Sequence, residues 1–186
     1  QYGIVSTFQS WQSLFAVIVT LNLSQGVFNN GMLDFKNNRD EFQFSLIAIT
    51  TVSTAIFAFL FFVLKKQFIE LLDLPMVMVY VMTLYFLFVP AYQFWAGRQR
   101  YEYRYKGLAA ISVGIGFFSL AFGVISVLRA PDDSTAVARV CAIEGVNIAV
   151  GVVFFCYTAF KAKFKVRFEC CSYALRFNVP LIPHYL

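Results

Sequence analysis

The 186 residues are 60% hydrophobic and 19% aromatic, only 13% are charged, and the formal net charge is +5. Together with a mean hydropathy of +0.69, this composition excludes an ordinary soluble domain. The basic excess does not indicate nucleic acid, because the Lys and Arg residues fall in short loops between long apolar stretches. The sequence therefore predicts an all-α integral membrane protein.

Five stretches are apolar over the roughly 20 residues that a helix needs to cross the hydrocarbon. They predict transmembrane helices near 5–28, 42–64, 75–97, 107–128 and 136–160, followed by the truncated start of a sixth at 177–186. The chain lacks a starting Met and a basic leader, and it stops at what reads as the opening of a helix. We expect a single transmembrane domain over 1–186 that is a piece of a longer protein.

Lys and Arg divide unevenly between alternate loops. The first, third and fifth loops hold eleven of them: Lys36, Arg39, Arg98, Arg100, Arg104, Lys106, Lys161, Lys163, Lys165, Arg167 and Arg176. The second and fourth loops hold only Lys65, Lys66, Arg129 and Arg139. The positive-inside rule therefore predicts that the first, third and fifth loops are cytoplasmic and that residue 1 is outside.

The first span carries polar side chains on a narrow arc of the helix, namely Gln9, Ser13, Thr20 and Ser24. Such an arc faces protein or water instead of lipid. Two interpretations remain open, because small hydroxylated residues allow close helix packing and also line polar cavities.

Three local features follow along the chain. Residues 65–73 mix charges with apolar side chains, which suits either a short interfacial helix or an extension of the second span that ends before Pro75. Pro90 predicts a kink in the third span. The fourth span has two glycine pairs on opposite faces, which favours close packing on both sides: Gly107 with Gly114, and Gly116 with Gly123.

The fifth span must carry Glu144 into the bilayer in order to be long enough. Asn147 lies on the same face, whereas Arg139 is turned too far round the helix to be an easy partner. An intramembrane carboxylate is a candidate for ion or proton coupling, but Glu144 is also shallow enough to reach headgroup water. The candidate cavity or coupling residues are Glu144, Asn147, Arg139, Gln9, Ser13 and Thr20.

No enzyme signature is present. The four cysteines lack metal-ligand spacing, and the one histidine, His184, has no acidic or Cys neighbour. There is no nucleophile elbow, P-loop or zinc motif. We therefore expect no catalytic residue, metal or cofactor.

Four segments, in order, resemble the polysaccharide flippase family, the O-antigen and lipid-linked oligosaccharide translocases of the MATE-like exporter superfamily. Tyr2–Ile4 is similar to the family's entry to its second helix. The others resemble its first cytoplasmic turn, its basic tyrosine-containing loop and the start of its seventh helix: Leu21–Met32 with Asn38–Phe42, Arg98–Lys106, and Phe177–His184.

The resemblance implies most of the N-terminal bundle of a two-bundle transporter in the plasma membrane of a prokaryote. Such a protein moves polyprenyl-pyrophosphate-linked sugar outward, with polysaccharide polymerase and other assembly proteins as partners. Its lumen usually takes cationic residues for the pyrophosphate, yet the centres of these spans contain none, and Arg139 is the nearest. A multidrug or cation exporter of the same fold and a non-transporting scaffold for polysaccharide assembly are the alternatives.

Overall fold

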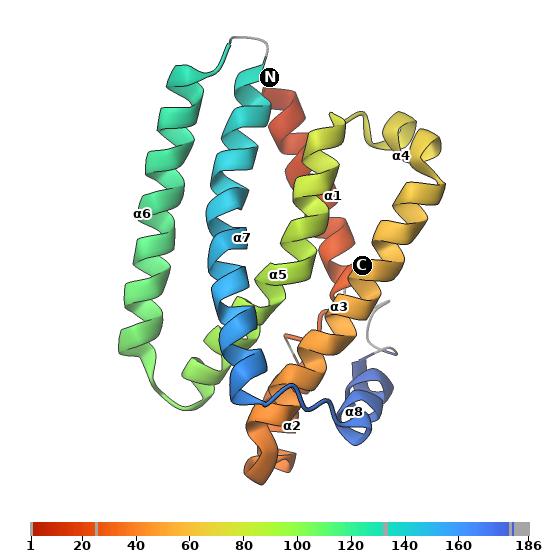
Figure 1. The fold of residues 1–186 in the computed structure, drawn as a ribbon, viewed down its shortest axis with the longest axis vertical. Coiled ribbons are helices and arrows are strands. Elements are labelled where there is room, and N and C mark those ends of the chain that lie inside the picture. Colours follow the sequence, from red (N-terminus) through yellow and green to blue (C-terminus); the bar gives the residue numbers. More distant parts are fainter. Residues whose placement is uncertain (1, 25, 132–133, 179, 181–186) are drawn as a thin grey trace.

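A computed structural model describes residues 2–24, 26–131, 134–178 and 180. The regular structure in this part of the chain is all helical (Figure 1), which confirms the predicted class. The elements are α1 (Tyr2–Val19), α2 (Gly26–Asp34), the 3-10 turn η1 (Lys36–Asn38), α3 (Arg39–Val63), α4 (Lys65–Leu72), α5 (Met76–Tyr101), α6 (Tyr105–Arg129), α7 (Thr135–Lys161) and α8 (Phe168–Asn178).

Four of these helices, α3, α5, α6 and α7, are long and apolar enough to cross a membrane. They match the spans predicted at 42–64, 75–97, 107–128 and 136–160, and they run side by side along the long axis of the bundle (Figure 1). The chain is therefore built as a membrane-embedded helical bundle.

The first predicted span, 5–28, is not one continuous helix. The apolar helix α1 ends at Val19 and α2 begins at Gly26, while Leu21 and Asn22 between them adopt left-handed backbone angles, with φ of 51° and 47°. Asn tolerates this conformation, and the following Ser and Gly have weak helix propensity. Of the sixth span expected at 177–186, residues 177 and 178 end α8, and residues 179 and 181–186 lie outside the described residues.

The segment 65–73 forms a separate short helix, α4, instead of extending α3. Asp73, with φ 49°, ends α4, and Pro75 precedes α5. Its apolar side chains Phe68 and Leu72 pack on the core, and its charged residues point outward. Figure 1 shows α4 turned away from the direction of α3.

Pro90 lies inside α5, and the helix changes direction in its second half (Figure 1). Proline cannot donate the backbone hydrogen bond to the carbonyl four residues earlier, which is that of Phe86. The one hydrogen of the Thr54 hydroxyl on α3 is shared between this carbonyl, at 3.3 Å, and Thr50 O of its own helix, at 2.7 Å. The neighbouring helix thus supplies the donor that α5 lacks, and α5 remains one helix.

Glycines set the closest helix contacts, but not all where the sequence suggested. At Gly151 of α7, an added Cβ would lie 2.7 Å from the backbone of Phe88 on α5, so these helices meet at backbone distance. On α6 only Gly123 packs against α7, at Ile143. The expectation of close packing on two faces of α6 is wrong within the described structure, because a Cβ at Gly107, Gly114 or Gly116 would have no neighbour within 4 Å.

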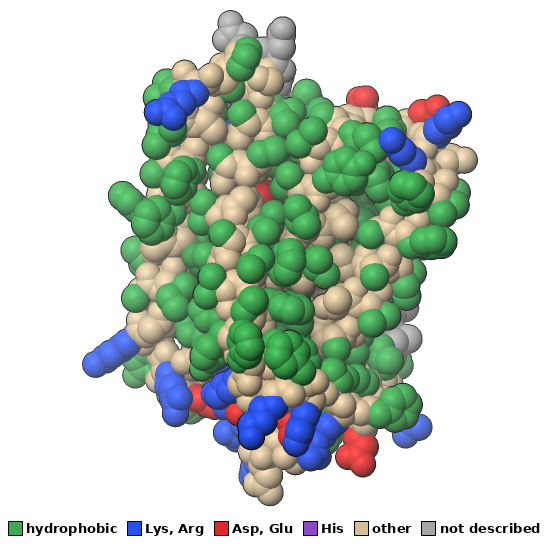
Figure 2. Space-filling view, viewed as in Figure 1, with side chains coloured by type: hydrophobic (Ala, Val, Ile, Leu, Met, Phe, Trp, Pro, Cys, Tyr) green, Lys and Arg blue, Asp and Glu red, His purple; other side chains and the backbone are tan. Residues whose placement is uncertain are grey.

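The loops with the most Lys and Arg all lie at one end of the bundle, the lower end in Figure 2. We call this the basic end. It contains α2, the α5–α6 connection and the segment between α7 and α8, whereas α4 and the α6–α7 connection lie at the opposite end (Figure 1). The surface between the two ends is largely apolar in this view.

Candidate functional site at a broken helix

The interruption between α1 and α2 is held by specific hydrogen bonds. The amide of Thr20 still bonds Ala16 O at 3.0 Å, and the amide of Leu23 closes a turn on Thr20 O at 3.2 Å. The carbonyl of Leu21 accepts a hydrogen bond from the side-chain amide of Asn178, the fully buried last residue of α8. An element far away in the chain therefore stabilises the break.

A cavity of about 460 Å³ opens beside this break. Non-helical backbone at membrane depth is tolerated where it is buried in protein or lines a water-filled space. The apolar part of the lining is Ala16, Val17, Pro90, Ala96 and Gly97. The polar part comes from α1, the break, α2 and α5: Thr20, Asn22, Ser24, Asn29, Tyr85, Tyr92, Gln93 and Arg100.

Arg100 is the one cationic residue among those that line this cavity. It is exposed near the end of α5 at the basic end. Arg98 and Arg104 pair with Asp40 or Glu102, but no carboxylate of the described residues lies within ion-pair distance of Arg100. Its guanidinium can therefore bind an anion that enters the cavity.

One face of α1 carries exposed polar side chains that lead to the cavity: Ser6, Gln9, Ser10 and Ser13. The hydroxyls of Ser10 and Ser13 bond back to the carbonyls of Ser6 and Gln9, at 3.0 and 2.8 Å. Farther along the same face, Val17 and Thr20 line the cavity. Such a stripe suits water or a polar partner, since lipid offers it no hydrogen bonds.

Glu144 lies outside the lining of the cavity but is linked to it through one side chain. Its carboxylate accepts a hydrogen bond of 3.0 Å from Asn147, one turn along α7. Tyr85 of α5 lies close enough to Glu144 to interact electrostatically, and Tyr85 also lines the cavity. Glu144 is therefore a neighbour of a cavity-lining residue without itself reaching the cavity.

The predicted residues thus separate into distinct places. Thr20 lines the cavity, Gln9 and Ser13 lie on the polar face that leads to it, and Glu144 with Asn147 lies behind Tyr85. Arg139 is not brought to the cavity, because it lines a groove between α6 and α7.

Sequence reasoning missed most of the polar lining. Arg100 is part of the basic run before α6, where the sequence analysis uses its charge only to predict membrane topology. The available signal was the polar, glycine-ended sequence from Asn22 to Gly26, which is poor in helix formers.

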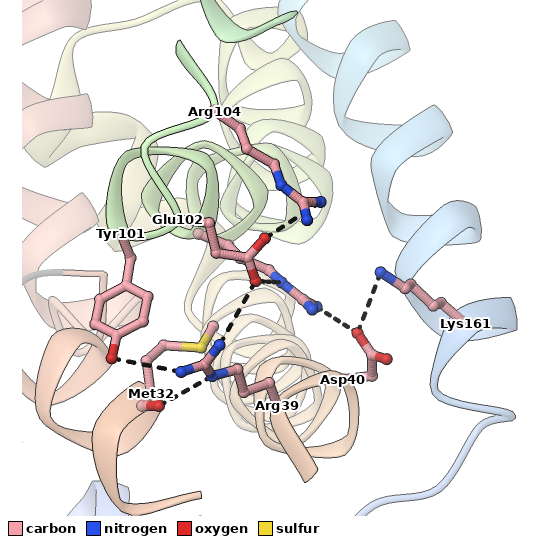
Figure 3. Close-up of polar contacts among 8 residues, drawn as sticks. Met32, Arg39, Asp40, Tyr101, Glu102, Arg104 and Lys161 are labelled. Carbon is pink, nitrogen blue, oxygen red and sulfur yellow. Dashed lines mark hydrogen bonds and ion pairs between the residues drawn. The ribbon is translucent and has the colours of Figure 1, made fainter. Parts of the chain in front are cut away.

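An ion-pair network ties the helix ends together at the basic end (Figure 3). Glu102 accepts a hydrogen bond of 2.8 Å from Arg98 and lies 3.4 Å from Arg104 and 3.9 Å from Arg39. Asp40 pairs with Arg98 and, at 3.4 Å, with Lys161. The network therefore connects α3, α5 and α7 at the basic end.

Arg39 makes two further contacts, of which the first extends the network to α2 and the second is to the last residue of α5. Its Nε donates to the carbonyl of Met32 at 3.1 Å, and its guanidinium lies 5.1 Å from the ring centre of Tyr101 (Figure 3). Burial alone would raise the pKa of Glu102, but the hydrogen bond and charge of Arg98, with the charges of Arg104 and Arg39, lower that pKa below its usual value. Glu102 is therefore the ionised centre of the network at neutral pH.

No grouping of His, Cys, Asp and Glu in the described part of the chain could hold a metal ion, and Cys141, Cys156, Cys170 and Cys171 are free thiols. No protein-family model matches the sequence, and no curated protein or solved structure resembles it significantly. The features of the chain that bear on its function are therefore the cavity, its charge and the helices around it.

Proposed function

We propose that this bundle belongs to a flippase that moves a polyprenyl-pyrophosphate-linked oligosaccharide from the cytoplasmic to the outer leaflet by alternating access. The observation that carries the proposal is the polar cavity at the break between α1 and α2, with Arg100 at the basic end, which pairs with no carboxylate of the described residues. Discontinuous helices that line a cavity are a recurrent feature of substrate sites in secondary transporters.

The lining suits a cargo that combines phosphate with sugar. Arg100 offers a cation for the pyrophosphate, and the amides of Asn22, Asn29 and Gln93 offer donors and acceptors for sugar hydroxyls. The basic end would face the cytoplasm by the positive-inside rule, where the lipid-linked precursor is loaded. The polar face of α1 would then line the route toward the other side.

Two weak points in the helices provide places where the bundle could change shape. One is the break at Leu21 and Asn22, and the other is Pro90 in α5; both border the cavity. The ion pairs of Figure 3 hold the basic ends of α3, α5 and α7 as a unit. In this proposal Glu144 is the candidate coupling carboxylate, and Tyr85 is its neighbour in the lining of the cavity.

A drug or cation exporter of the same architecture is the second candidate. The carboxylate of Glu144 beside Tyr85 favours it, because an exporter of cations needs an anionic group near its substrate. The positive charge of Arg100 in the cavity opposes a cationic cargo and favours the sugar carrier. A scaffold that does not transport would have no use for the cavity and would bury the polar face of α1 against protein.

The test is restoration of surface polysaccharide in a bacterial strain that lacks its own flippase, using the full-length gene. We expect rescue by the wild type and by Arg100→Lys, and loss of rescue with Arg100→Gln at equal membrane levels. Arg176→Gln is the matched control, because Arg176 is an exposed arginine at the basic end that does not line the cavity.

Full rescue by Arg100→Gln would show that transport does not need an anion-binding arginine in the cavity. Absence of rescue by the wild type, combined with export of a cationic dye by the same cells, would favour the drug exporter. The Glu144→Gln variant separates the remaining question: loss of rescue assigns a coupling role to the carboxylate, and full rescue leaves it a structural one.

A further inference from the structure

The hairpin of α6 and α7 carries a second hollow, separate from the cavity at the break. It is a groove of about 250 Å³. Most of its lining is apolar and comes from α6, with two residues from α7: Ser119, Leu120, Gly123, Val124, Val127 and Leu128, with Arg139 and Ile143. No residue is shared with the lining of the cavity.

The groove exists because one glycine lets the two helices approach. Gly123 is buried, and an added Cβ there would lie 3.3 Å from Ile143. On either side of it, Leu120 and Leu128 stand out from α6 with 69% and 80% of their surface exposed. The smaller residues between these two projecting leucines therefore leave a groove along the α6–α7 hairpin.

The length of this groove matches the hydrocarbon thickness of one leaflet of a membrane. From Ser119 to Leu128 the helix rises by about 14 Å, and half of the hydrocarbon core of a bilayer is about 15 Å. The volume over that length is enough for one hydrocarbon chain. The shape therefore favours a lipid tail as the occupant.

The end of the groove away from the basic end carries a charge. Arg139 lies near the start of α7, where α6 ends and the α6–α7 connection begins. Its side chain is exposed, and no carboxylate of the described residues, which leave out Asp132 and Asp133, pairs with it. A guanidinium at the end of an apolar channel complements a phosphate joined to an acyl chain.

We infer that the α6–α7 groove binds one anionic phospholipid, with an acyl chain along Leu120 to Leu128 and its phosphate on Arg139. This assigns Arg139 a lipid contact in place of the cavity role that the sequence suggested for it. The inference is independent of the cargo that the bundle transports.

The test is native mass spectrometry of the protein released from nanodiscs of phosphatidylcholine doped with phosphatidylglycerol. We expect wild type to retain phosphatidylglycerol in preference to phosphatidylcholine. Arg139→Gln should reduce this retention about fivefold, the effect of one cation near an anionic lipid surface. Val127→Phe, which fills the groove, should reduce retention of both lipids.

Two control variants change similar residues outside the groove. Arg129→Gln removes an exposed arginine at the same end of the hairpin, and Val113→Phe enlarges an exposed valine elsewhere on α6. Neither should change retention. Equal losses with Arg129→Gln and Arg139→Gln would mean a diffuse charge effect, and unchanged retention with both Arg139→Gln and Val127→Phe would mean that no site is present; either result overturns the inference.

Discussion

The interrupted segment α1–α2 and the continuous helix α6 present opposite surfaces on the same bundle. α6 runs for 25 residues without a break and exposes Val113, Phe117 and Leu128. α1 stops after 18 residues, exposes a stripe of Ser and Gln, and leads to a polar cavity. We therefore expect the exposed side chains of α6 to face lipid and those of the polar face of α1 to face water or a polar partner.

The sharpest way to break this comparison is to label single cysteines in intact membranes. In a background without the four native thiols, we expect Ser13→Cys on α1 to react with a water-soluble maleimide. Val113→Cys on α6, although 72% exposed, should stay unreactive because it faces hydrocarbon. Complete protection of Ser13→Cys would show a polar stripe buried against protein and would favour the scaffold.

The next largest effect is expected at the close contact between α5 and α7. The open face of α6 provides the comparison. Gly151→Ala adds a Cβ that would lie 2.7 Å from the backbone of Phe88, so α5 and α7 have to move apart. We expect a loss of about 2 kcal/mol in stability, measured as a lower midpoint of thermal aggregation in detergent. Gly114→Ala on α6 has no neighbour within 4 Å and should not lower the midpoint; equal loss in both variants would contradict the packing.

The helix α5 lies between these extremes, since it contains Pro90 and yet stays continuous. Thr54→Val removes the hydroxyl that donates to Phe86 O and should cost about 1 kcal/mol. Thr50→Val is the control, because the Thr50 hydroxyl bonds only Ile47 O of its own helix, at 2.9 Å. If Thr54→Val lowers the midpoint of thermal aggregation no more than Thr50→Val does, the hydrogen bond from α3 is not the reason that α5 stays continuous.

The smallest expected effect lies at the basic end, in the network of Figure 3. This network reaches α2 through the carbonyl of Met32 and the start of α6 through Arg104. The pKa of Glu102 is lower in the folded state, so its stabilising contribution is full above the unfolded pKa and is lost as the pH falls through the folded one. Glu102→Gln should lower stability by up to about 1 kcal/mol at neutral pH. The difference from wild type should shrink in acid, and a difference that is constant with pH would contradict the shift.

The sequence was sufficient for the four long helices, because each is an apolar stretch bounded by charges. It was insufficient for the break, since Leu21 and Leu23 continue the apolar pattern and the hydrogen bond that holds the break comes from Asn178. It also did not identify Arg100 as a cavity residue. Helical phase alone places Arg98 next to Glu102 one turn on and turns Arg100 away from that pair, but the cavity that Arg100 lines is formed with α1 and α2, whose arrangement the sequence does not show.

The hydrogen bond from Asn178 to Leu21 has a consequence for biogenesis. The two residues are 157 positions apart, and α3 to α7 lie between them in the chain. During synthesis the ribosome delivers residues 1–34 to the membrane long before Asn178 exists. The α1–α2 segment therefore has to enter the bilayer without its clamp, and its final shape is set only after the last described helix has been translated.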